Sequence, residues 1–257
     1  MVRYIIPHSL PGERERLEMF ASMLDTNLFF RLGEIGVKPG WKCLEAGAGI
    51  GTVSQWLSEQ VGPKGEVTVS DLDTKFINEL AGGNLKVRQL DLQTDFLGEG
   101  YDLIVTRNCL HHLPMRYDII SRMAEALNPG GWLVLEEPDF YPVHTTLNSA
   151  VQSFWTGFLE WSENRSVDYK IGRRLGPWLS EQGLVDISVN GDTKTFQGGS
   201  DLSKFWIQTY TELKSQLLST GFLSEEVFDA AMAHFSDPKA WVTQCSFVIG
   251  AGKKRSS

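Results

Sequence analysis

The stretch E-A-G-A-G-I-G, residues 45–51, decides the fold of this chain. It follows a short, mostly apolar run at residues 41–44, which is typical of a buried parallel strand. Apolar residues then recur at the spacing of one helix face: Val53, Trp56, Leu57 and Val61. The alternating glycines therefore lie in a strand-to-helix turn, where the backbone can approach a ligand closely and the helix presents unpaired N–H groups.

The spacing of these glycines argues against a dinucleotide as the ligand. A G-x-G-x-x-G fingerprint that starts at Gly47 would place its third glycine at position 52, which is Thr52. The observed glycines are Gly47, Gly49 and Gly51, and Glu45 precedes them by two residues. A carboxylate there would repel a pyrophosphate, and it suits a ligand that carries an ammonium group.

The segments after the glycine turn alternate between strand and helix patterns, which predicts a parallel sheet. Strands are expected at residues 67–71, 85–90, 101–106 and 132–136, with Asp71 ending the second strand and Asp91 following the third. R-N-C-L-H-H-L-P (107–114) follows the fourth strand, and the turn N-P-G-G (128–131) leads into the fifth.

Over about residues 38–190, these motifs and their order resemble the class I S-adenosylmethionine (SAM)-dependent methyltransferases. The resemblance implies a Rossmann-like sheet of seven strands, six parallel and the last antiparallel, with helices on both faces and a helical cap. It also implies SAM as the cofactor.

The expected organisation is one methyltransferase domain at residues 38–250. An N-terminal helical segment, 1–37, would fold over the cofactor as a lid or serve as plain packing, and 251–257 would form a flexible tail. Cap insertions are expected at about 140–172 and 191–240. Further helices are expected at 13–32, 173–182, 202–219 and 224–235, and within 142–165, where an apolar stripe starts at Leu147. The sixth and seventh strands are expected at 184–189 and 241–250.

The resemblance assigns residues of the first two strand ends to the methionine and ribose parts of SAM. Glu45 would hold the methionine ammonium group, in part through water or backbone. Gly47, Gly49 and Gly51 would touch the methionine portion, and Asp71 would accept hydrogen bonds from the ribose hydroxyls.

The resemblance assigns the other cofactor residues to the adenine ring and to the end of the fourth strand. Asp91 would accept from the adenine amino group, while Leu72 and Leu92 would sandwich the ring. Arg107 follows the strand whose backbone carbonyls would bind the ammonium group. Helix capping is the alternative for Asp71 and Asp91, and a surface salt bridge is the alternative for Arg107.

The acceptor side rests on residues just past the fourth and fifth strands. His112 is the expected base, because imidazole titrates near neutrality and could take a proton from a hydroxyl acceptor. His111 would then pack or hold the loop. Glu137 or Asp139 would orient a hydroxyl or an amine, with a solvated loop as the alternative.

Composition narrows the class of partner. The chain has 257 residues, a net charge of −8 and a sequence pI of about 5.2, which argues against a broad nucleic-acid contact. Three scattered cysteines do not predict a disulfide framework or a zinc site, and no metal is expected. No apolar stretch approaches the length of a membrane span, so a cytoplasmic protein is expected.

These features predict an enzyme that methylates a small organic acceptor, a hydrophobic or aromatic secondary metabolite. Oxygen is the expected target atom, with nitrogen and carbon open. A SAM-binding protein of the same fold that catalyses cyclisation or decarboxylation is the alternative from another class. A macromolecule methyltransferase is a further alternative, although the sequence R-N-C-L stands where amino-group modifiers of DNA and protein carry N-P-P-Y or D-P-P-Y.

Overall fold

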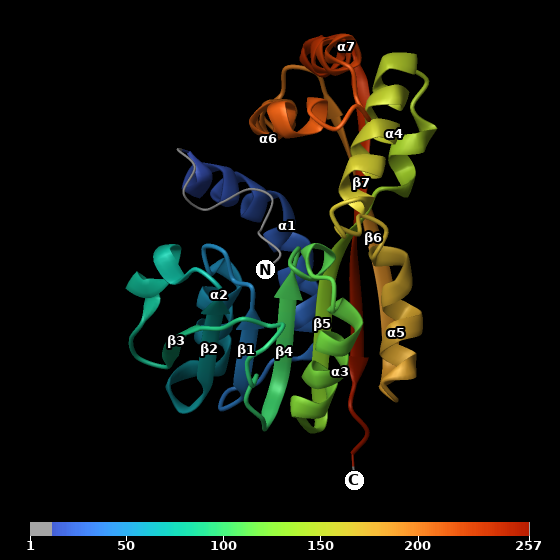
Figure 1. Cartoon of the computed structure of the whole chain (residues 1–257). Coiled ribbons are helices and arrows are strands. Elements are labelled where there is room, and N and C mark those ends of the chain that lie inside the picture. Colours follow the sequence, from blue (N-terminus) through green and yellow to red (C-terminus); the bar gives the residue numbers. More distant parts are fainter. Residues whose placement is uncertain (1–11, 257) are drawn as a thin grey trace.

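The computed structural model describes residues 12–256, which form a seven-stranded mixed sheet with helices on both faces (Figure 1). The strand order is β3-β2-β1-β4-β5-β7-β6, and β7 runs in the opposite direction to the other six described strands. The strands are β1 (Lys42–Ala46), β2 (Glu66–Asp71), β3 (Leu85–Gln89), β4 (Tyr101–Arg107), β5 (Leu127–Asp139), β6 (Val185–Gln197) and β7 (Trp241–Lys253). The predicted fold class is confirmed.

Two pairs of helices cover the two faces of the sheet. Helices α1 (Glu13–Ile35) and α2 (Thr52–Val61) pack on one face, where Leu28, Leu57 and Val105 share an apolar cluster. Helices α3 (Arg116–Ala126) and α5 (Leu175–Glu181) pack on the other face. Because parallel strands end at the same edge, the loops after β1, β2 and β4 meet there.

The remaining helices build a cap above that edge. They are α4 (Ser149–Glu163), α6 (Asp201–Leu218) and α7 (Glu225–Ser236), and each begins after a side chain that caps its first turn, from Asn148, Ser200 and Ser224 respectively. They lie beside the outer halves of β6 and β7, which project beyond the sheet (Figure 1).

Aromatic residues from α4, α6 and α7 form the core of the cap, including Trp155, Phe158 and Tyr210. Helix α1 joins the cap to the sheet, because its Leu24 belongs to the cap core whereas its Leu28 belongs to the sheet core. Of the expected N-terminal lid, the structure describes α1, and residues 1–11 lie outside the described part.

Several boundaries differ from those expected. Strand β5 includes Glu137 and Asp139, which were expected to follow it, and both side chains are buried, so the solvated-loop alternative is wrong. Strand β7 continues through 251–253, which pair with β5, so these residues belong to the sheet rather than to a flexible tail. Residues 128–131 lie within β5 at an irregularity of its pairing with β4. Strand β6 is also longer, because residues 190–197 keep pairing with β7 above the sheet. Leu147 is fully exposed and precedes the cap residue Asn148, so it lies outside the helix that it was expected to start.

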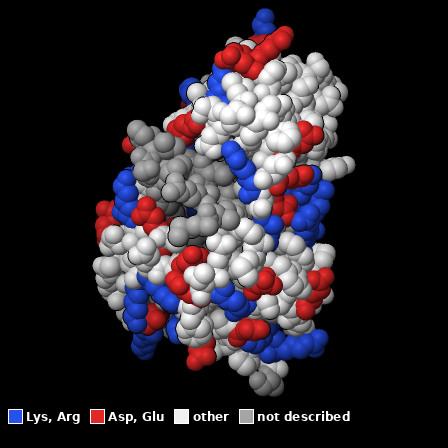
Figure 2. All heavy atoms as spheres, viewed as in Figure 1, with Lys and Arg blue, Asp and Glu red and all other residues white. Residues whose placement is uncertain are grey.

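Charged residues of both signs are interspersed over the face that Figure 2 shows, and uncharged residues cover much of the upper part, where the cap lies. Among the described helices, none is both long and apolar enough to cross a membrane.

Candidate active site

The glycine turn adopts the left-handed backbone that its sequence predicts. Gly47, Gly49 and Gly51 have φ values of 74°, 59° and 74°. A Cβ on Gly47 would lie 2.5 Å from the Cys109 sulfur, so packing against the loop after β4 requires glycine there. Within residues 12–256, the nearest atoms to a Cβ on Gly49 would be the Leu17 methyl carbons at 4.0 Å. The described residues therefore leave the backbone at Gly49 open to close approach, and its expected contact with the cofactor stays a prediction.

Glu45 lies beneath this turn and is 2% exposed. Its Oε2 accepts hydrogen bonds from the Ser54 backbone N–H at 2.8 Å and from the Ser54 hydroxyl at 2.5 Å. Burial raises the pKa of Glu45 to about 7. The carboxylate thus braces the start of α2, and its expected contact with the methionine ammonium group stays a prediction.

Two aspartates at the sheet edge brace neighbouring backbone. Asp71 accepts from the Gly49 N–H at 2.9 Å and from the Asp73 N–H at 3.1 Å. Asp91 Oδ1 accepts from the Gln93 N–H at 2.9 Å. Asp71 therefore joins the end of β2 to the centre of the glycine turn, which is compatible with a ribose-binding role. For Asp91 the observed contact is the turn-capping one, and its adenine contact stays a prediction.

The two leucines expected to sandwich the adenine lie in different environments. Leu72 is 55% exposed, whereas Leu92 is 5% exposed and belongs to the core beside α3. The structure therefore leaves Leu72 available to a ligand and gives Leu92 a packing role.

Arg107 anchors the end of β4 to both helices of its face. Its guanidinium donates to Asp25 of α1 at 2.5 Å and to the Thr52 hydroxyl of α2 at 3.0 Å. Thr52 in turn donates to Asp25 at 3.0 Å. The side chain is 10% exposed, so this contact is a partly buried ion pair rather than the surface salt bridge considered from the sequence.

Glu136 lies beside Arg107 in the sheet register and is 1% exposed. Its Oε2 has no hydrogen-bond partner in the described part of the chain. Burial raises the pKa of this carboxyl to about 8. A raised pKa in the folded state adds stability below the unfolded value near 4.5, and that stability is lost as pH rises through about 8.

We therefore expect Glu136→Gln, which does not titrate, to become more stable relative to the native chain as pH rises from 6 to 9. The difference in melting temperature should grow by a few degrees, since about 1 kcal/mol corresponds to roughly 2–4 °C at this size. Thermal unfolding followed by circular dichroism at both pH values measures it. Glu125→Gln, at an exposed carboxylate of α3, is the control, and a pH-independent difference for Glu136→Gln would contradict the assignment.

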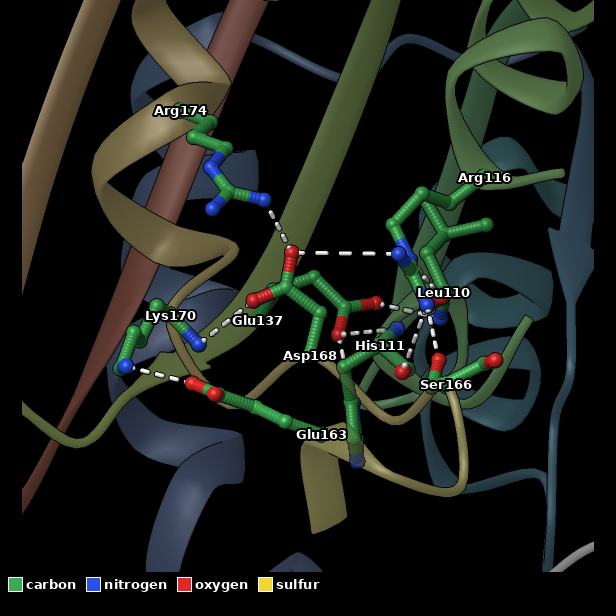
Figure 3. Close-up of polar contacts among 9 residues, drawn as sticks. All are labelled: Leu110, His111, Arg116, Glu137, Glu163, Ser166, Asp168, Lys170 and Arg174. Carbon is green, nitrogen blue, oxygen red and sulfur yellow. Dashed lines mark hydrogen bonds and ion pairs between the residues drawn. The ribbon is translucent and has the colours of Figure 1, made fainter. Parts of the chain in front are cut away.

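The carboxylate of Glu137 organises the loop after β4. This side chain is fully buried, and its Oε1 accepts from the backbone N–H groups of Cys109 at 3.1 Å and Leu110 at 2.8 Å. Its Oε2 faces His111, accepting from the backbone N–H at 3.2 Å and lying 2.7 Å from ring Nδ1 (Figure 3). Four contacts occupy the carboxylate, so it holds the loop and the imidazole rather than an acceptor.

Burial sets the protonation of this pair. It lowers the pKa of His111 to about 3, with the Arg116 guanidinium acting in the same direction. Burial also raises the pKa of Glu137 to about 7, against backbone N–H groups that lower it. The imidazole is therefore neutral at pH 7. With Nδ1–H donated to Glu137, its Nε2 carries the lone pair that a base requires.

The geometry thus favours His111 over His112 as the base. His112 follows it in the same short turn, η4 (Leu110–His112), and the two ring centroids lie 3.8 Å apart. Burial and the neighbouring His111 hold the pKa of His112 well below its usual value. The Glu137 carboxylate lies 2.7 Å from His111 Nδ1, and this contact is the observation that favours His111.

Arg116 and Asp168 make further contacts that hold this loop (Figure 3). Arg116 donates to the carbonyls of Leu110 and His111, at 3.3 Å each, and also to that of Ser166. The Asp168 backbone N–H donates to the His111 carbonyl at 2.8 Å, and the Asp168 carboxylate pairs with Arg174. The segment that follows α4 therefore helps to position the His111 ring.

Sequence reasoning missed His111 as the oriented imidazole, and also Asp25, Arg116 and Asp168. The sequence of two adjacent histidines does not show which ring faces the fifth strand, because the backbone of the short turn η4 determines the direction of each side chain. The alternation of β5 carried a signal, since residues 133, 135 and 137 share the face beside α3.

Comparisons with known proteins match part of this sequence to methyltransferases and match its fold to solved structures. A family model described as a methyltransferase domain matches residues 44–133. Methyltransferase str3 of Strobilurus tenacellus is 28% identical over 183 residues, 69% of this chain and 65% of that protein. Squalestatin hexaketide synthase of Phoma sp. is 31% identical over 129 residues, 44% of this chain and 5% of the synthase. The chain thus spans under two thirds of the first relative and a small part of the second.

Solved structures show the same fold. Phosphoethanolamine N-methyltransferase 2 of Haemonchus contortus, determined in complex with SAM, has a TM-score of 0.59 and 16% identity over 98% of this chain and 62% of that chain. The glycine turn thus lies within the segment that matches a methyltransferase domain, and the solved structure shares the fold of this chain.

Proposed function

We propose that this protein transfers the methyl group of SAM to a small, hydrophobic organic acceptor, and that the methylated atom is an oxygen. The observation that carries the proposal is the buried His111–Glu137 pair, 2.7 Å apart, in the loop that packs against the glycine turn. A neutral imidazole held by Glu137 has a free ring nitrogen for the proton that an acceptor loses on methylation, and the neighbouring carboxylate would offset the positive charge that develops on the ring.

Different residues of the chain would bind SAM and remove the acceptor proton. Bound SAM supplies an electrophilic methyl group on a sulfonium. The turn at Gly49 gives a close backbone surface, and Asp71 accepts from ribose hydroxyls. Glu137 holds Nδ1–H of His111, so that Nε2 takes the acceptor proton. Burial keeps water from this pair, and positioning of this kind contributes several kcal/mol to the rate.

A second candidate is transfer to an acidic carbon next to a carbonyl group. The same pair would take the proton from that carbon. The similarity to squalestatin hexaketide synthase and to highly reducing polyketide synthases favours this candidate, since their names describe carbon chains built with carbonyl groups.

Product analysis with SAM carrying a ¹³C-labelled methyl group tests both candidates. The purified protein is incubated with a panel of phenols, enols and β-ketoacyl thioesters. A ¹³C methoxy signal with stoichiometric S-adenosylhomocysteine supports the oxygen proposal, and a ¹³C C-methyl signal supports the second candidate. Turnover of an acceptor with SAM left intact would refute both and favour a non-methylating reaction.

We expect Asp71→Ala to weaken SAM binding by about 1–3 kcal/mol, the usual cost of losing hydrogen bonds to a charged group. Part of the loss would come from the Gly49 N–H, which Asp71 holds at 2.9 Å. Isothermal titration calorimetry measures the affinity, with Asp73→Ala, at an exposed neighbour, as the matched control. Unchanged affinity of Asp71→Ala would remove Asp71 from the cofactor site.

A further inference from the structure

Several polar atoms inside the aromatic core of the cap have no hydrogen-bond partner in the described part of the chain. Four of them are the Tyr210 hydroxyl, the Thr209 hydroxyl and the indole nitrogens of Trp155 and Trp206, and the Trp161 indole nitrogen is another. All four side chains are at least nine-tenths buried. A buried donor left without a partner costs about 1–3 kcal/mol, and folded proteins contain few of them.

These groups lie together rather than scattered. The Tyr210 ring stacks on Trp206 at 5.4 Å and meets the edge of Trp155 at 5.5 Å. Trp206, Thr209 and Tyr210 share the inner face of α6, while Trp155 comes from α4. Helices distant in sequence thus direct hydrogen-bond donors into one region of the cap.

A continuous series of rings joins this region to the reactive imidazole. The Tyr169 ring lies 5.2 Å from His111 and 5.2 Å from Phe158, and Phe158 lies 5.3 Å from Tyr210. An apolar molecule bound against this series would reach from the cap to His111.

The chemistry of the donors defines the ligand. Indole N–H groups donate only, so they require acceptor atoms on the ligand. Among the buried described residues, Arg16 is the one Lys or Arg side chain, and Glu13 pairs with it at 2.7 Å. The four donors are themselves uncharged and suit uncharged carbonyl oxygens, while the half-buried Arg165 guanidinium stacks over the Trp161 ring at 4.8 Å.

We propose that the inner faces of α4 and α6 bind the acceptor, an uncharged apolar molecule whose carbonyl oxygens accept hydrogen bonds from Tyr210, Trp155 and Trp206. This proposal rests on the proposed function, because it assigns the substrate class of that reaction. Tyr210 is the residue that selects for an oxygenated ligand over a plain hydrocarbon.

Binding of prodan, an uncharged naphthalene ketone whose fluorescence reports its surroundings, tests the site without methyl transfer. We expect saturable binding to the native protein and a roughly 2- to 12-fold weaker affinity for Tyr210→Phe, the range for one neutral hydrogen bond. The prodan analogue with its carbonyl reduced to a methylene should bind both proteins equally and more weakly than prodan binds the native protein. Tyr141→Phe, at an exposed tyrosine, should match the native protein.

Thermal unfolding tests whether weaker prodan binding by Tyr210→Phe comes from loss of stability rather than from loss of the hydroxyl. Removing a hydroxyl that has no partner in the protein should leave the melting temperature of Tyr210→Phe unchanged or higher. Equal prodan affinity of Tyr210→Phe and native protein, or a lower melting temperature, would overturn the proposal. Because prodan binding needs no SAM, its loss on Tyr210→Phe is read separately from the ¹³C product assay, whose failure would count against the proposed function alone.

Discussion

Replacing His111 by alanine is expected to slow methyl transfer by about 10²- to 10⁴-fold, the usual contribution of a positioned general base. The ring is neutral at pH 7, and its Nδ1 lies 2.7 Å from the Glu137 carboxylate, which orients it. SAM affinity should not change, because the cofactor contacts proposed here lie on the glycine turn and on Asp71. Single-turnover kinetics with the acceptor identified by the ¹³C assay, together with calorimetry for SAM, provides the measurement.

Two further variants separate a base from a packing residue. His112→Ala should retain more activity than His111→Ala, and the opposite order would restore His112 as the base. His144→Ala, at an exposed histidine, is the control for loss of an imidazole. A rate for His111→Ala within twofold of the native rate would assign proton removal to another group or to water.

Introducing a side chain at Gly49 is expected to weaken SAM binding at least tenfold, or about 1.4 kcal/mol. The space around Gly49 accepts a methyl group as far as the described residues go, since their nearest atoms to a Cβ are Leu17 carbons at 4.0 Å. The Gly49→Ala protein should therefore fold, at a cost of about 1–2 kcal/mol for its left-handed backbone. The added methyl would occupy the surface that we assign to the cofactor, and calorimetry measures the loss.

Gly36→Ala provides the matched control for backbone strain. Gly36 also has a positive φ, 78°, with nothing within 4 Å of a Cβ, and it lies at the far end of α1. Both variants should lose similar stability in denaturant unfolding, whereas Gly49→Ala alone should lose SAM affinity. Equal affinity in the two variants would remove Gly49 from the cradle.

The sheet and the glycine turn were predictable because their signals are local. Alternating glycines, acids after strands and apolar runs each act within a few residues, whereas the antiparallel last strand was implied by the family resemblance and the strand order was not predicted. The helices of the cap were also predictable, because Ser200 and Ser224 precede periodic apolar runs.

The partners of the site residues were not predictable, since they depend on distant contacts. Arg107 meets Asp25, which lies 82 positions away, and Glu137 meets the backbone of 109–111. Sequence patterns placed these side chains at the edge of the sheet where the parallel strands end. They could not show that the Glu137 carboxylate accepts hydrogen bonds from the backbone of the loop after β4. The length of β6 was underestimated because its outer half includes polar and half-exposed residues, which weaken the strand signal. The expected end of β7 fell before residues 251–253, which pair with β5.

Helix α1 has a consequence for how this protein unfolds. One helix contributes Leu24 to the interior of the cap and Leu28 and Leu32 to the interior of the sheet, so neither hydrophobic interior is complete without it. Separating the cap from the sheet would expose apolar surface on both at once. The two parts should therefore melt in one cooperative transition, and movements that admit a substrate are confined to rearrangements that leave the middle of α1 in place.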